Sequence, residues 1–242
     1  MAPMSPPGQF AGGPHESRDD GMTGAATVPT VERPLPLAAA DTWRLFDALL
    51  YSVSHDLRSP LLSLTLSADL LRDSAAAVPD GGTREVALDG LRYGARDMER
   101  MLQSLTVLSR ARRRVFEHDR GPLGLILGGH LVMSDIEGLA SRVVAVDPMT
   151  VRELLDEVAG EGPVEVRVNV EGDFVVLSVP VNADLPPFEG RPLYALASSL
   201  QAYAGSAVER LAAAQVVLDR QGASFSVEGV RLTVWLPLGE SR

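Results

Sequence analysis

The hydrophobic pattern begins with two long helical stretches. Across residues 38–77, apolar side chains recur every three or four positions, which is the period of one helix face: Phe46, Leu50, Val53, Leu57, Leu61, Leu64, Ala68 and Leu71. The run Val78-Pro79-Asp80-Gly81-Gly82 then breaks the pattern. A second stripe starts near Thr83 and continues to about Arg114. Two amphipathic helices joined by a short loop predict an antiparallel helical hairpin, and pairing of two hairpins into a dimeric four-helix bundle would cover both stripes.

The second half of the chain has a different pattern. Residues 149–159 are helical, and residues 164–170 alternate as a strand that turns at 171–173 into a second strand over 174–181. A long helix is expected from Tyr194 to Arg220, with a weak point at Gly205. Residues 223–227 and 230–236 form another strand pair. Together these elements predict an α+β fold in which helices cover an antiparallel sheet.

Composition indicates the domain boundaries and excludes one class of partner. Residues 1–37 are rich in Pro, Gly, Ser and Thr and predict a disordered tail, followed by the hairpin at 38–116 and the α/β region at 117–242. All 22 basic residues are arginine against 32 acidic ones, and a net charge of -10 argues against a nucleic-acid partner.

The same composition bears on location. Without cysteine the chain has neither disulfides nor thiolate zinc sites. The most apolar stretch, residues 121–133, is shorter than the ~20 residues that a membrane span needs. We therefore expect a cytoplasmic protein with no membrane span.

One motif in the first helix carries chemistry: Ser54-His55-Asp56-Leu57-Arg58-Ser59-Pro60-Leu61. Val53 and Leu57 belong to the apolar stripe, and two residues turn a helix by about 200°, so His55 should face water. A neutral imidazole there can act as a nucleophile through one ring nitrogen while Asp56 holds the other.

The rest of the motif surrounds this pair. Pro60 has no N–H, so the carbonyl of Asp56 loses its helical partner and the helix should bend just past His55. Arg58 can pair with a phosphoryl group or an acidic partner. Ser59 adds a hydroxyl one helical turn after His55.

This motif resembles the H-box of two-component sensor histidine kinases, which lies on the first helix of their dimerisation and phosphoacceptor domain. The resemblance extends over residues 40–238, because the second half follows the order of the family's ATPase-like domain. It implies a helical hairpin that forms a dimeric four-helix bundle, followed by an α/β sandwich of the ATPase-like type. It also implies His55, Asp56, Arg58 and Ser59 as the catalytic set, with a response-regulator receiver domain and a second copy of the chain as partners.

The ATP-binding features of that family are changed here. Glu157 stands where the family has a magnesium-binding Asn, and Val181 takes the place of the Asp that reads adenine, with no glycine after it. Val208, Glu209 and Arg210 replace the Gly-x-Gly that cradles phosphates. We expect the fold to be kept and the nucleotide site to be lost, so no cofactor is anticipated.

These observations favour a two-component phosphorelay protein that exchanges a phosphoryl group between His55 and receiver domains. One alternative is an autophosphorylating sensor kinase with a divergent site, in which Glu153 and Glu157 serve magnesium and ATP is bound. A second alternative is a non-catalytic scaffold that binds a response regulator. The retained pair His55 and Asp56 speaks against the scaffold, which does not need it.

Overall fold

The structure is a computed structural model that describes residues 32–74, 81–116, 118–127, 131–133, 138–159, 164–181 and 185–239. Most of the predicted tail and most of the predicted break at 78–82 lie outside these described residues. The domain boundaries at 37 and 116 therefore remain predictions.

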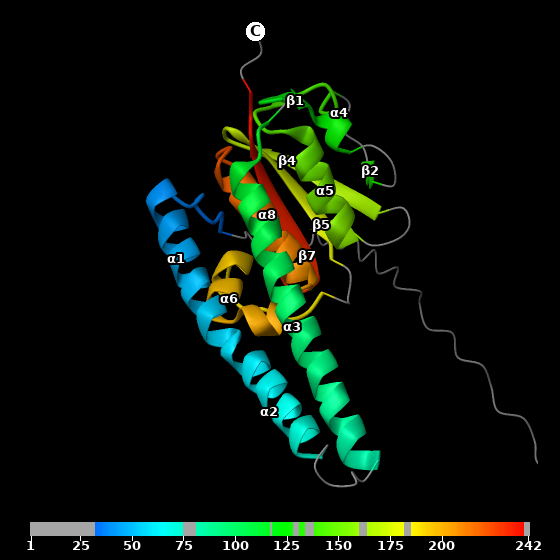
Figure 1. Cartoon of the computed structure of the whole chain (residues 1–242). Helices are drawn as coiled ribbons and strands as arrows, with labels where there is room; N and C mark the ends of the chain where they lie inside the picture. Colours follow the sequence, from blue (N-terminus) through cyan, green and yellow to red (C-terminus); the bar gives the residue numbers. More distant parts are fainter. Residues whose placement is uncertain are drawn as a thin grey trace, which may run out of the picture. The chain divides into compact units, whose positions relative to one another are not determined.

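The predicted helical hairpin is confirmed. Its first arm contains α1 (Ala39–Asp56) and α2 (Arg58–Ser74), and its second arm is α3 (Gly81–Arg113) (Figure 1). α3 begins two residues before the expected start at Thr83. The first arm is interrupted at Leu57, one residue after Asp56, as expected from the missing N–H of Pro60.

Glycines allow α2 and α3 to pack closely. A Cβ added to Gly90 would lie 2.3 Å from Ser67 Oγ, and one on Gly94 would lie 3.0 Å from the carbonyl oxygen of Pro60. At Gly94 the neighbour is backbone, which can move little, so a side chain there would crowd the contact between α2 and α3; at Gly90 the Ser67 hydroxyl would have to move.

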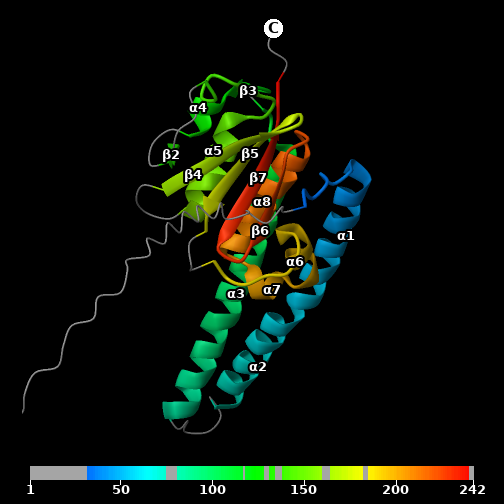
Figure 2. The ribbon, with the colours of Figure 1, turned by 180° about the vertical axis from the view of Figure 1, so that it is seen from behind.

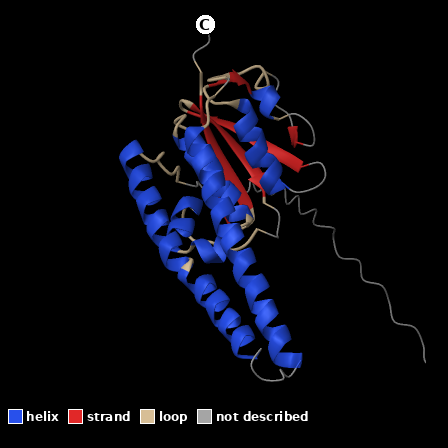
Figure 3. Ribbon diagram, viewed as in Figure 1, coloured by secondary structure: helices blue, strands red, loops and turns tan. Residues whose placement is uncertain are grey.

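The α/β region is built on a sheet, drawn in red in Figure 3. The sheet has five strands in the order β2-β4-β5-β7-β6. β4 (Val164–Glu171) and β5 (Phe174–Pro180) form the first predicted strand pair, and β6 (Ser224–Glu228) and β7 (Arg231–Pro237) form the second. The four predicted strands pair antiparallel, as expected, whereas β2 (Leu131–Met133), which was not predicted, adds to β4 in parallel.

Short elements precede the sheet. β1 (Gly121–Pro122) pairs with β3 (Val143–Val144), and α4 (Leu123–Ile126) lies between them in sequence. None of these was expected from the sequence, because each is too short to show a period. α5 (Pro148–Ala159) matches the predicted helix.

The long helix expected from Tyr194 to Arg220 is instead three helices: α6 (Pro192–Ser198), α7 (Leu200–Tyr203) and α8 (Ala207–Asp219). The first break is at Ser199, whose backbone is extended, with φ -158° and ψ 99°. The second break contains Gly205 at φ 73°, the left-handed region that glycine adopts at little cost, and it lies at the predicted weak point.

Two apolar cores share α8. One core joins the sheet to α5 and to the face of α8 that carries Leu211 and Leu218. The other joins the opposite face of α8, with Ala212 and Val216, to α1, α3, α6 and α7. A helix with apolar residues on both sides is typical of a buried position.

The second core shows that part of the hairpin's apolar surface is covered by the α/β region of the same chain. Figures 1 and 2 show α1 and α3 spread apart with α6 between them, while α2 and α3 lie side by side. On α1 the buried face is therefore formed by Leu45, Phe46, Leu49 and Val53. Leu50 and Leu61, which were expected on the buried stripe, are exposed. The α/β region covers part of the hairpin that was assigned to a partner copy.

In the part of the chain that the structure describes, every helix is too short or too polar to cross a membrane.

Candidate functional site

His55 lies in the last turn of α1 with its side chain 71% exposed, which confirms that it points away from the apolar core. Its Nδ1 atom is 3.2 Å from Oδ1 of Asp56. When the carboxylate is ionised it can only accept, so this contact places the proton on Nδ1 and leaves the lone pair on Nε2. The ring is thus arranged as a solvent-facing nucleophile.

Asp56 is held more tightly than His55. Its side chain is only 12% exposed, and Oδ2 accepts hydrogen bonds from Ser52 Oγ at 3.3 Å and from the Gln201 N–H at 3.1 Å. Burial raises the pKa of Asp56, but hydrogen bonds from Gln201, His55, Ser52 and Leu200 outweigh it and leave the pKa below its ordinary value. Asp56 is therefore ionised over the whole physiological range.

Arg58 and Ser59 follow in the first turn of α2, where both are exposed. Neither side chain makes a hydrogen bond or ion pair with another described residue. The structure thus brings His55 and Asp56 into contact and leaves Arg58 and Ser59 beside them, facing solvent.

Two groups at this site were missed by sequence reasoning. Ser52 precedes Asp56 by four residues, a spacing that places both on one helix face and that could have indicated their contact. The N–H of Gln201 comes from α7, 145 positions away in sequence, and no local pattern points to it.

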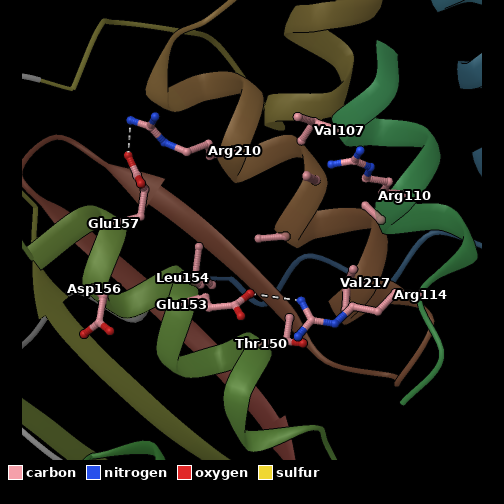
Figure 4. Close-up of a pocket in the computed structure, with 13 residues that line it drawn as sticks. Val107, Arg110, Arg114, Thr150, Glu153, Leu154, Asp156, Glu157, Arg210 and Val217 are labelled. Carbon is pink, nitrogen blue, oxygen red and sulfur yellow. Dashed lines mark hydrogen bonds and ion pairs between the residues drawn. The ribbon is translucent and has the colours of Figure 1, made fainter. Parts of the chain in front are cut away.

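A cleft of about 720 Å³ lies between α3, α5 and α8, where the resemblance places part of the nucleotide site (Figure 4). Two ion pairs line it. Arg210 of α8 is 2.5 Å from Glu157 of α5, and Arg114, just beyond α3, is 2.9 Å from Glu153. Both carboxylates suggested as magnesium ligands therefore face guanidinium groups.

The residues at the other altered positions are integrated in the fold. Glu209 is buried, and its Oε2 accepts hydrogen bonds from Ser104 Oγ at 2.5 Å and from the Gly205 N–H at 2.6 Å. The N–H of Val181 donates to the carbonyl of Val230 at 2.8 Å, and its side chain packs against the sheet core.

Comparison with known families identifies the class of the hairpin. Residues 47–114 match the His Kinase A (phospho-acceptor) domain, a segment that contains His55 and both arms of the hairpin. The hairpin is therefore identified as a phospho-acceptor domain of the kind found in two-component histidine kinases. No curated protein matches the sequence.

Solved structures of low similarity were also found. One is described as a bacterial phosphotransferase, with 14% identity, a TM-score of 0.35, and coverage of 85% of this chain and 100% of that one. The histidine kinase AdeS of Acinetobacter baumannii has 14% identity, a TM-score of 0.34, and coverage of 77% and 98%. A histidine kinase of Burkholderia phymatum has 15% identity, a TM-score of 0.25, and coverage of 84% and 99%.

Proposed function

We propose that the chain is a phosphorelay protein in which His55 receives a phosphoryl group from the aspartyl phosphate of one receiver domain and passes it to another. The observation that carries this proposal is the exposed His55 ring, whose Nδ1 is engaged by a carboxylate while Nε2 remains open to solvent.

The transfer step follows from this arrangement. The Nε2 lone pair attacks phosphorus, a new N–P bond forms, and the P–O bond to the donor aspartate breaks so that its carboxylate leaves. Positive charge develops on the imidazole, and Asp56 stabilises it across the Nδ1–H contact. In this proposal Arg58, exposed in the first turn of α2, pairs with the phosphoryl oxygens. The reverse sequence transfers the group to the next receiver.

Several contacts support a donor other than ATP. Glu157 and Arg210, which the resemblance aligns with the family's magnesium-binding Asn and phosphate-cradling glycine stretch, instead form an ion pair between α5 and α8. Glu209 would place a negative charge beside nucleotide phosphates, and Val181 has no acceptor for adenine. The core that joins α8 to α1 and α3 also argues for an α/β region that stays on the hairpin.

Self-association into a four-helix bundle is part of the proposal. α2 exposes Leu61, Leu62, Leu66 and Leu70, and α3 exposes Val86, Leu88, Tyr93 and Leu102. Large apolar side chains exposed along both helices support an interaction surface on this part of the hairpin. Figure 1 shows α2 and the first part of α3 extending beyond the sheet and its helices, and a second copy presents the same face.

Phosphoryl transfer from receivers tests the proposal. A panel of isolated receiver domains, labelled with acetyl phosphate, is incubated with the full chain, with His55→Ala, and with His118→Ala as a matched control of an exposed histidine. We expect the wild type and His118→Ala to take up label and His55→Ala to take up none. Equal loss of receiver label with the wild type and His55→Ala would instead support a scaffold.

Calorimetric titration with ATP and magnesium separates the relay from the kinase. The relay predicts no binding heat at millimolar nucleotide, whereas binding followed by label on His55 would establish the autokinase alternative.

A further inference from the structure

The Asp56 carboxylate is contacted from two parts of the chain that are far apart in sequence. Ser52, one turn earlier in α1, and the backbone N–H of Gln201, in α7 of the α/β region, both donate to Oδ2. The opposite oxygen, Oδ1, faces Nδ1 of His55. With Oδ2 occupied, the plane of the carboxylate is fixed, and Oδ1 is the oxygen left for the ring.

α7 is itself anchored. Leu200, next to Gln201, is fully buried in the core that also contains Leu49 and Val53 of α1. Ser199 accepts a hydrogen bond from the Ala202 N–H across the turn at 3.4 Å. Figure 2 shows α7 against the junction of α1 and α2. The Gln201 N–H is therefore held at its place by packing, and it is not set by the exposed side chain of Gln201.

From this geometry we propose that Ser52 and the α7 backbone are positioning groups for Asp56, so that the α/β region sets the tautomer and the nucleophilicity of His55. This inference rests on the proposed function, since it concerns the same histidine. The inference gives the α/β region, which binds no nucleotide in the proposed function, a direct part in phosphoryl transfer. A hydrogen bond to a charged group contributes more than a neutral one, and in a shielded site it also restricts the carboxylate rotamer.

The hydroxyl of Ser52 can be removed and restored. In Ser52→Ala the Oγ donor is lost, and in Ser52→Thr it is kept. We expect Ser52→Ala to slow transfer from a labelled receiver about fivefold to tenfold, as expected for loss of one charge-assisted hydrogen bond acting through a second residue, and Ser52→Thr to restore at least half of the rate.

A second pair of variants tests the hydrogen bond that the backbone N–H of Gln201 donates to Asp56. Gln201→Pro removes the N–H, while Gln201→Ala keeps it and changes only the exposed side chain. We expect Gln201→Pro to slow transfer by a similar factor and Gln201→Ala to transfer at the wild-type rate. Thermal unfolding of each full-length variant identifies any loss of fold.

The decisive readout is the tautomer of His55, measured from the imidazole 15N shifts of the unphosphorylated chain. We expect Nδ1–H to dominate in the wild type, Ser52→Thr and Gln201→Ala, and the Nε2–H form to grow in Ser52→Ala and Gln201→Pro. A purely structural role for Ser52 would not move this population.

The outcomes separate the two proposals. If the wild type takes no label from any receiver but the Nε2–H form grows in Ser52→Ala and Gln201→Pro, the proposed function fails and the positioning holds. If the wild type transfers label while Ser52→Ala and Gln201→Pro match it in both rate and tautomer, the positioning inference is overturned.

Discussion

Ser104 Oγ in α3 donates a hydrogen bond of 2.5 Å to Oε2 of Glu209 in α8, within the boundary between the hairpin and the α/β region. Glu209 is one of the residues that the sequence resemblance aligns with a phosphate-cradling glycine stretch. A buried carboxylate must be hydrogen-bonded, and the second donor to the same oxygen is the N–H of Gly205. The altered position is thus a structural contact between the two parts of the chain.

Removal of the Ser104 hydroxyl should destabilise the fold. In Ser104→Ala, Glu209 keeps only the Gly205 donor in a buried site, and we expect the free energy of unfolding to fall by about 1–3 kcal/mol. Thr106 bonds the carbonyl of Leu102 on the exposed face of the same helix, so Thr106→Ala should cost less than about 0.5 kcal/mol. Urea denaturation of both variants measures the difference, and equal small losses would contradict a structural role for this contact.

Arg220 joins the end of α8 to the end of α3. Its Nη1 atom donates to three main-chain carbonyls at distances of 3.0–3.3 Å, those of Ala111, Arg112 and Arg114. These carbonyls lie at and just beyond the C-terminal end of α3, where positive charge is favourable.

We therefore expect Arg220→Ala to lower the free energy of unfolding by about 1–3 kcal/mol. Arg113, an exposed arginine in the last turn of α3, provides the matched control, and Arg113→Ala should change stability by less than about 0.5 kcal/mol. Thermal unfolding checks both values. A larger loss in the Arg113 variant would show that general charge at the helix end matters more than the specific hydrogen bonds.

Asp219 gives the fold a pH dependence. Burial raises the pKa of Asp219 to about 6, against smaller opposing effects from the Leu37 backbone, Arg191 and Gln215. Because the folded chain binds this proton more tightly than the unfolded chain, the contribution is fully present below the ordinary pKa of 3.8 and is lost as the pH rises through about 6.

Asp219→Asn removes this titration. At about pH 7.5 we expect the variant to be more stable than the wild type by about 1–2 kcal/mol, and at about pH 4.5 the difference should shrink. Urea unfolding at both pH values makes the comparison. A constant difference would mean that the carboxyl is not responsible.

The exposed leucines of α2 test self-association. Leu62→Glu together with Leu66→Glu places charges on the surface proposed to meet a second copy, which should convert a dimer into monomers. Val230→Glu, at the exposed turn between β6 and β7, is the control and should leave the dimer intact. Light scattering coupled to gel filtration reports the mass. A monomeric wild type would contradict the proposed bundle.

Much of the fold was predictable because its elements are long and periodic. The hairpin and the two antiparallel strand pairs follow directly from apolar spacing. The break at Ser199 was not predictable, because an extended serine between two helical segments leaves no periodic signal. The exposure of Leu50 was missed because the period alone does not tell which neighbour covers a helix face, and here α6 packs against the face that carries Leu49.

The part of the candidate site formed by neighbouring residues of α1 was predictable from the sequence. The exposure of His55 and its contact with Asp56 follow from their adjacency and from the stripe around them. The contact of Asp56 with Gln201 depends on the packing of α7 against α1, a long-range arrangement that the sequence does not encode locally. The ion pair of Glu157 with Arg210 is also a long-range contact that no local pattern predicts. The sequence identified both residues as departures from the family pattern, but not that they would meet.

The most direct test compares two donors on one sample. The full chain is incubated in parallel with labelled ATP and magnesium and with a labelled receiver domain from the panel, and the phosphorylated residue is identified by mass spectrometry at neutral pH. We predict label on His55 from the receiver, none from ATP, and none from either donor in His55→Ala. Label on His55 from ATP alone would contradict the relay and establish a kinase.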